Sequence, residues 1–140
     1  MNDILEDNKL KSLRSLIKWP IVLVGMMGSG KTHVGKLLAR ILDYDFYDSD
    51  HIIESKAGCT INEIFERFGE DKFRSSEHKT ISELFCKGPC VIATGGGAVT
   101  NPQILSKIKQ DSYSVWLDAS AQDLYIRLKD KTDRPLLLSL

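Results

Sequence analysis

The residues best suited to chemistry are the eight from Gly25 to Thr32, which read Gly-Met-Met-Gly-Ser-Gly-Lys-Thr. Glycines let a backbone curl closely around a bound group, because no side chain stands in the way. Turned N–H groups at the start of a helix attract an anion, and Lys31 adds a mobile positive charge. The hydroxyl of Thr32 suits Mg²⁺. The segment therefore predicts a phosphate-binding loop.

The alternative interpretation is a glycine-rich turn beside an incidental lysine. The flanking elements argue against it, since the apolar run 21–24 predicts a strand before the loop. An amphipathic helix is predicted after the loop by Val34, Leu37, Leu38, Ile41 and Leu42. A strand, a loop and a helix in this order are the context that the motif requires. We expect nucleotide phosphates to be held by Gly28, Ser29, Gly30, Lys31 and Thr32.

Composition indicates one globular domain. The chain has 140 residues, of which 42% are hydrophobic and 27% charged, and its formal net charge is zero. A neutral chain gives no support for nucleic-acid binding, and no apolar run reaches the length of a membrane span. Three cysteines without a C-x-x-C pair and an acidic N-terminus without a signal-peptide pattern favour the cytoplasm. We expect a monomer.

Strands and helices alternate along the sequence, which predicts a parallel sheet with helical crossovers. Residues 1–19 form a polar lead that either docks as a short helix or frays, and the domain proper is expected over 20–140. After the first strand, further strands are predicted at 44–47, 90–93 and 113–117. Helices are predicted at 51–57, from a capping box at 60–63, at 70–85, after Asn101-Pro102 and at 120–129.

Three polar segments leave the carboxyl ends of these strands: Gly25–Thr32, Asp48–Asp50 and Thr94–Gly97. Ligands of open parallel sheets bind at that edge. The three segments are therefore expected to converge on one cleft. An acidic pair in a loop is usually solvated surface, but opposite a phosphate loop it becomes a candidate for metal or substrate binding.

Taken together, these motifs resemble the shikimate kinase family, which comprises small P-loop kinases. The resemblance runs from about residue 19 to residue 140 and rests on five segments in the family's order. These are Gly25–Thr32, Asp48-Ser49-Asp50, the Phe68-Gly69-Glu70 to Glu77 element, Gly95-Gly96-Gly97-Ala98 and Arg134-Pro135-Leu136-Leu137. It implies a three-layer α/β P-loop kinase fold around a central parallel sheet, and ATP-dependent phosphorylation of the 3-hydroxyl of shikimate.

The resemblance also implies roles for individual residues. Lys31, Asp50 and Arg134 would be catalytic, and Asp48 would sit with Thr32 near Mg²⁺. Asp50 would orient or deprotonate the attacking hydroxyl. Substrate would be bound by Asp50, Arg74, Gly95, Gly96 and Gly97, with Arg74 on the carboxylate.

Further roles are implied for the apolar wall and the lid. Ile61, Phe65, Phe73 and Pro135 would line the substrate pocket, although helix core is an equal interpretation for Ile61 and Phe65. Arg127 would stack on the adenine, and Arg134 would close over the phosphates. For Arg74 the plain alternative is an exposed i,i+3 pair with Glu77, and in the family the glutamate holds the arginine, so both can be true.

The chain departs from the family pattern at its end. Family members continue beyond the lid motif with a fifth strand, a final helix and a second substrate-binding arginine, whereas this sequence stops at Leu140. We expect a sheet of four strands, truncated within the lid, whose open edge could pair with another chain. Two alternatives to a shikimate kinase follow: a non-catalytic nucleotide- or phosphate-binding form, and a kinase for another polyhydroxy acid such as gluconate.

Overall fold

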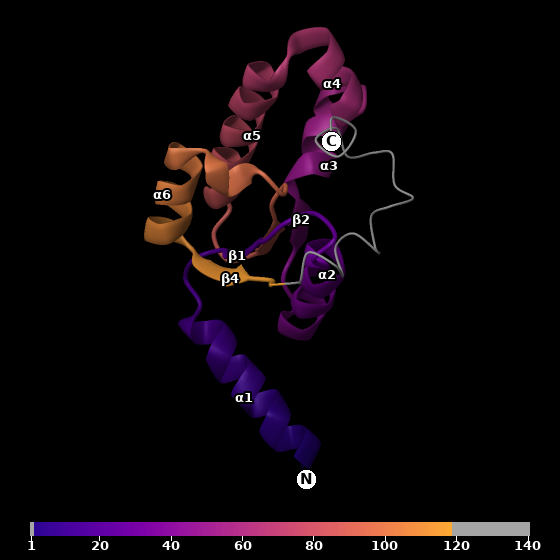
Figure 1. The fold of residues 1–140 in the computed structure, drawn as a ribbon. Coiled ribbons are helices and arrows are strands. Elements are labelled where there is room, and N and C mark those ends of the chain that lie inside the picture. The colour runs from indigo at the N-terminus through magenta and orange to yellow at the C-terminus, as the bar shows by residue number, and fades with distance from the viewer. Residues whose placement is uncertain (1, 119–140) are drawn as a thin grey trace.

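The computed structural model describes residues 2–118 of the chain. Its centre is a four-stranded sheet in the order β2-β3-β1-β4, and every pair of neighbouring strands is parallel (Figure 1). The strands are β1 Ile21–Val24, β2 Phe46–Asp48, β3 Val91–Ala93 and β4 Tyr113–Trp116. The predicted four-stranded parallel sheet is confirmed.

The helices begin and end largely where the capping signals predict. They are α1 Asn2–Leu16, α2 Lys31–Leu42, α3 Ser49–Ala57, α4 Ile61–Phe68, α5 Glu70–Phe85, the short 3₁₀ turn η1 Ala98–Thr100 and α6 Pro102–Asp111. The Thr60 hydroxyl accepts the Glu63 N–H at 3.2 Å, as a capping box requires. Asn101 accepts the Gln103 N–H at 2.9 Å, with Pro102 at the first helical position. The helix predicted at 120–129 lies outside the described residues.

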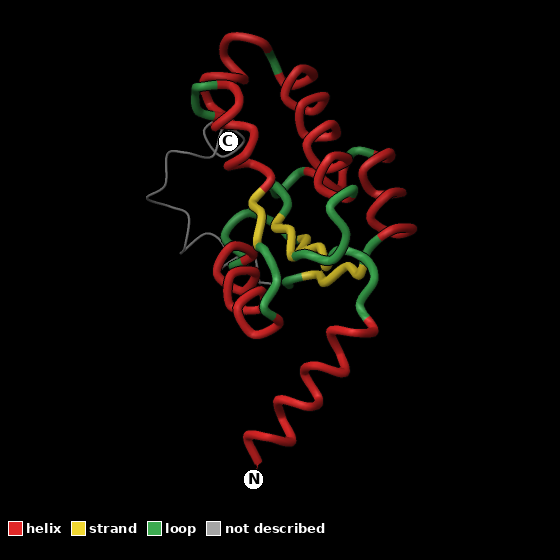
Figure 2. Tube along the Cα trace, turned by 180° about the vertical axis from the view of Figure 1, so that it is seen from behind, coloured by secondary structure: helices red, strands yellow, loops and turns green. Residues whose placement is uncertain are grey.

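Helices cover both faces of the sheet and so form three layers (Figure 2). On one face, Leu23 packs with Ala39 and Leu42 of α2. On the other face, Val22 packs with side chains of α5 and α6, among them Ile81 and Ile104. Strands that are apolar on both faces are typical of a sheet buried between helices. The sheet is thereby fixed as a rigid base for the loops at its carboxyl edge.

The buried face of α2 differs from the predicted stripe. Leu38 and Leu42 of the stripe pack in the core on this side of the sheet, whereas Val34, Leu37 and Ile41 are 36%, 49% and 52% exposed. The helix instead turns small residues toward the sheet, since a Cβ on Gly35 would lie 2.5 Å from the Phe46 ring. Small residues allow close packing of helix on sheet.

Helix α1 extends away from the sheet and its packed helices (Figures 1 and 2). Its last turn contacts the domain, where Arg14 lies 3.6 Å from the Asp43 carboxylate and Tyr44 donates to the Arg14 carbonyl. Leu10 and Ile17 pack against the apolar cluster on that side of the sheet. The lead thus forms a helix that docks at its C-terminal end.

None of the helices within 2–118 is long and apolar enough to cross a membrane.

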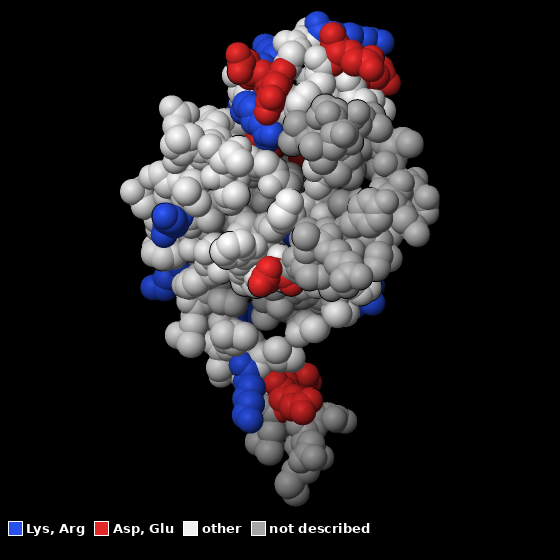
Figure 3. Space-filling view, in the orientation of Figure 1, with Lys and Arg blue, Asp and Glu red and all other residues white. Residues whose placement is uncertain are grey.

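Charged side chains of both signs intermix at the end of the molecule formed by α4 and α5 (Figure 3). On α4, for example, Arg67 lies 3.3 Å from Glu63 in an i,i+4 pair. Exposed pairs of this kind add little stability.

Among the cysteines of the described chain, Cys90 is buried in the core, and burial raises the pKa of its thiol to about 11. It therefore stays protonated near neutral pH and serves packing.

Candidate active site

The three polar segments predicted to converge do meet at the carboxyl edge of the sheet. The Thr32 hydroxyl donates to Asp48 Oδ2 at 3.0 Å, which joins the loop after β1 to the end of β2. A Cβ placed on Gly96 would lie 3.1 Å from the Met27 amide nitrogen, so the glycine loop after β3 lies against the same loop. The parallel order of β2, β3 and β1 brings these loops side by side.

The loop after β1 has the backbone that its glycines predict. Gly28 and Gly30 have φ of 80° and 96°, in the left-handed region where only glycine is relaxed. Lys31 begins α2 and is only 9% exposed. Its ammonium donates to the carbonyl oxygens of Gly25 and Met26, the latter at 2.9 Å. Its charge is thus held at the mouth of a curled loop and at a helix N-terminus, which suits a bound phosphate.

Asp48 has two roles, one for each carboxylate oxygen. Oδ1 accepts the N–H groups of Asp50 and His51 at 3.1 and 3.2 Å and so caps α3. Because of this cap the helix begins at Ser49, and the prediction that it begins at His51 was wrong. Oδ2 is left to face Thr32. The cap therefore fixes the direction in which Asp48 presents its second oxygen.

The Thr32 hydroxyl and the Asp48 carboxylate fit a Mg²⁺ ion. Mg²⁺ prefers hard oxygen ligands, keeps several waters and commonly binds through one or two protein groups together with substrate phosphates. Within residues 2–118 no group of three or more His, Cys, Asp or Glu side chains is placed to hold a metal by itself. The donor set thus suits an ion that arrives with a nucleotide rather than a resident metal.

Asp50 and Glu77 come together beside Gly95. A Cβ on Gly95 would lie 2.6 Å from Asp50 Oδ1 and 3.0 Å from Glu77 Oε2, so both carboxylates border the same glycine. Asp50 belongs to the first turn of α3, and Glu77 is a fully buried residue of α5. The absence of a side chain at Gly95 is what lets two acidic groups from different helices approach the loop.

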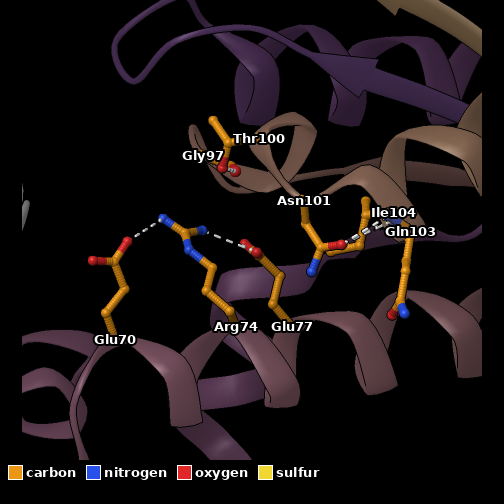
Figure 4. A network of polar contacts seen from close by, with 8 residues as sticks. All are labelled: Glu70, Arg74, Glu77, Gly97, Thr100, Asn101, Gln103 and Ile104. Atoms are coloured by element: carbon orange, nitrogen blue, oxygen red, sulfur yellow. Dashed lines mark hydrogen bonds and ion pairs between the residues drawn. The ribbon is translucent and has the colours of Figure 1, made fainter.

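Arg74 is held between two glutamates of its own helix, as Figure 4 shows. Nη1 lies 2.9 Å from Glu77 Oε1, and Nη2 lies 3.5 Å from Glu70 Oε1. The Arg74 side chain is 18% exposed, whereas that of Glu77 is 0% exposed. Burial raises the pKa of Glu77, and the hydrogen bond and charge of Arg74 oppose that rise. The predicted i,i+3 pair therefore exists as a partly buried ion pair, with its carboxylate fully buried.

The third glycine of the loop lies directly against this arginine. A Cβ on Gly97 would be 2.5 Å from Arg74 Nη2 and 3.0 Å from Nη1. The φ of Gly97 is −100°, a value that any residue adopts, so its backbone does not require glycine. The requirement comes from the close approach of the guanidinium. Glycines 95 and 97 thus give room to Asp50 and Arg74 respectively.

We predict that Gly97→Ala displaces the Arg74 guanidinium without straining the backbone. A group that binds to Arg74 should then bind more weakly, by about tenfold if one charge-assisted hydrogen bond of about 1.5 kcal/mol is lost. Steady-state kinetics will measure this as a raised KM for the carboxylate substrate, with the KM for nucleotide unchanged. An equal rise in both values would show that the substitution disturbs the whole loop.

The apolar side chains expected in the pocket form a cluster beside Arg74. Phe73 is 4% exposed and packs with Ile53 and Ile64, and its ring centroid lies 5.1 Å from that of Phe65. Ile61 and Phe65 are only partly buried against this cluster. Both interpretations therefore stay possible for Ile61 and Phe65, while Phe73 is clearly a core residue.

Some predicted residues lie outside the described part of the chain, namely Arg127, Arg134 and Pro135.

One residue at the site was given no role from the sequence. Glu70 was noted only as part of a motif, yet its carboxylate reaches Arg74. Its i,i+4 spacing from Arg74 was the available signal.

Comparison with known proteins decides the family. The shikimate kinase family matches the chain over residues 27–139. The chain belongs to the shikimate kinase family. A shikimate kinase from Thermodesulfovibrio yellowstonii is 47% identical over 117 residues, covering 84% of this chain and 68% of that protein. The curated family members that it matches are longer, and the chain spans between 56% and 73% of their lengths.

Solved structures of the family agree with the fold. A shikimate kinase from Acinetobacter baumannii in complex with shikimate has a TM-score of 0.86 and 41% identity, covering 91% of this chain and 70% of that one. A gluconokinase from Sinorhizobium meliloti 1021 has a TM-score of 0.56 at 21% identity, covering 86% of this chain and 70% of that one. The second likeness shows a shared fold alone. The three-layer P-loop kinase architecture expected from the sequence is confirmed.

Proposed function

We propose that the protein transfers the γ-phosphoryl group of ATP to the 3-hydroxyl of shikimate. The observation that carries this proposal is the placement of Arg74 and Asp50 around one glycine loop, next to the phosphate-binding loop. A guanidinium and a carboxylate that border the same glycine loop match a ligand with one carboxylate and several hydroxyls. Family membership supports the same assignment.

ATP would be held mainly by the loop from Gly25 to Thr32. The amides of Gly28, Ser29 and Gly30 and the N-terminus of α2 would hold the phosphates, and Lys31, which here donates to its own loop carbonyls, would donate to the β- and γ-oxygens. Thr32 and Asp48 would hold Mg²⁺. When bound, the ion supplies positive charge to the phosphate oxygens. The chain's own groups fix the direction of the transferred phosphoryl group.

Shikimate would bind on the other side of the glycine loop. Arg74 would take its carboxylate through two parallel N–H donors, with Glu77 keeping the guanidinium in place. Asp50 would accept a hydrogen bond from the 3-hydroxyl and receive its proton as the oxygen attacks phosphorus. The backbone at Gly95–Gly97 would approach the substrate, which requires residues without side chains.

The remaining assignments rest on the resemblance to the family. Arg134 would close over the phosphates as part of a lid and exclude water, and Arg127 would stack on the adenine. Both residues lie outside the described part of the chain. A cytoplasmic, monomeric enzyme is the accompanying proposal.

A coupled assay of ADP release tests the function in the full-length protein. We expect ADP release to require shikimate and Mg²⁺ and to saturate with shikimate. Gluconate in place of shikimate should give no release above the rate without acceptor, because its flexible chain does not place a carboxylate and a hydroxyl at fixed separation. Binding of ATP without ADP release in the presence of either acceptor would support a nucleotide-binding form without kinase activity.

A further inference from the structure

The charge arrangement around Arg74 gives Glu70 a role that the family resemblance does not assign. Nη1 of Arg74 donates one of its two N–H groups to Glu77, a partner that is fully buried and 2.9 Å away. The Nη2 side is different, because its partner Glu70 is 54% exposed and lies at 3.5 Å. Figure 4 shows Glu70 and Glu77 on opposite sides of the guanidinium. One contact is therefore permanent, and the other can be exchanged.

The exchangeable side is also the side that faces the glycine loop. A Cβ on Gly97 would lie closer to Nη2 than to Nη1, at 2.5 Å against 3.0 Å. A substrate held by that loop would meet Nη2 first. There it would compete with the Glu70 carboxylate, which has the same charge and the same geometry as the carboxylate of the substrate.

The space around Glu70 allows its side chain to move away from Arg74. A hollow of about 590 Å³ borders Arg74 and contains Glu70 among its lining residues, together with Asp71, Thr100, Asn101, Pro102 and Gln103. Glu70 is the first residue of α5, and its N-cap is Gly69, so its side chain is at the end of the helix and not packed within it. A long exposed side chain in such a place exchanges its contacts with water readily.

We infer that Glu70 is a placeholder carboxylate, which occupies the substrate side of Arg74 in the free enzyme and is displaced when shikimate binds. This inference rests on the proposed function. In this role Glu70 keeps the Arg74 guanidinium extended toward the site through its contact with Nη2. The same contact competes with the carboxylate of the substrate. Glu70 acts through Arg74 and is a specificity and positioning residue that does not touch the reacting atoms.

The test compares Glu70→Gln with Asp71→Asn in the full-length protein. Both changes remove one negative charge from the first turn of α5 and so alter the helix dipole interaction equally. Only Glu70 contacts Arg74 among the described interactions of these two residues. We expect Glu70→Gln to lower the KM for shikimate by about two- to fivefold, since an exposed ion pair of this kind is weak. The kcat and the KM for ATP should not change.

The salt dependence of the shikimate KM shows whether Glu70 competes with the substrate for Arg74 or supports Arg74. Added salt screens an exposed ion pair, so the KM advantage of Glu70→Gln should shrink as ionic strength rises. A KM at or above that of the parent enzyme, or an equal fall in Asp71→Asn, would overturn the placeholder role while leaving the kinase function intact. Absence of shikimate-dependent turnover in the parent enzyme would overturn the function, and this role with it.

Discussion

Replacing Asp50 by Asn should lower kcat for shikimate phosphorylation by about 10²- to 10⁴-fold, the range for loss of a positioned general base. Asn keeps the size of the side chain and loses its ability to take the proton of the attacking hydroxyl. The local structure should survive, because Asp50 contributes its backbone N–H to the cap of α3, and that group is unchanged. Rapid-quench or steady-state kinetics will measure the effect.

Asp48→Asn is the matched control for that experiment. Asn caps a helix as well as Asp does, so α3 should remain intact, while the oxygen facing Thr32 loses its charge. We expect this variant to need a higher Mg²⁺ concentration for half-maximal rate, whereas Asp50→Asn should keep the Mg²⁺ dependence of the parent. If kcat survives in Asp50→Asn, the role of Asp50 as base is wrong and positioning alone accounts for catalysis.

Replacing Arg74 by Ala should have two large effects that can be separated. Loss of a bidentate, charge-assisted clamp should raise the KM for shikimate by about 10²-fold or more, at about 1.5–3 kcal/mol for each hydrogen bond. The same change leaves the fully buried Glu77 without its cation. Breaking a buried pair in this way costs about 3–5 kcal/mol of unfolding free energy. The KM for ATP should change little.

The double variant Arg74→Ala with Glu77→Gln distinguishes the two effects. Glu77→Gln removes the unpaired negative charge, so much of the free energy of unfolding in denaturant should be recovered. It cannot replace the guanidinium that binds the carboxylate, so the shikimate KM should stay high. Recovery of both properties would show that Arg74 acts only by holding the fold together. Equal effects of Arg74→Ala on the two KM values would remove Arg74 from the substrate site.

The pH dependence of Arg74→Ala follows from the pKa of Glu77. Burial raises this pKa above its ordinary value of 4.5, and Arg74 is the group that opposes the rise. Without Arg74 the folded-state pKa moves further up, so the folded state binds a proton more tightly than the unfolded state. The stability deficit should then be small near pH 4.5 and grow as pH rises toward the raised pKa.

Much of the site could be predicted because its chemistry lies in short motifs. The phosphate loop, the Asp48–Asp50 pair and the i,i+3 relation of Arg74 and Glu77 are set by local spacing. That these loops meet follows from the parallel sheet, since all of them leave the carboxyl ends of strands. The sequence therefore predicted that these loops lie side by side.

Features that depend on three-dimensional packing were predicted less well. The stripe of large apolar residues on α2 indicated only part of the buried face, because Leu42 is buried together with Gly35 and Ala39, whereas Val34 and Leu37 are exposed. The start of α3 was misplaced because the side chain of Asp48 serves as both cap and site residue. The reason for Gly97 became visible only with the position of Arg74, which comes from a different helix.

The most direct test of the central claim is phosphorus and proton NMR of the product formed by the full-length protein from ATP, Mg²⁺ and shikimate. The proposed mechanism predicts a single new phosphate ester, coupled to the ring proton at carbon 3, formed in equal amount with ADP. Omission of shikimate should abolish it. An ester on another hydroxyl, or ADP formed together with free inorganic phosphate only, would contradict the assignment of Asp50 and Arg74 to the substrate.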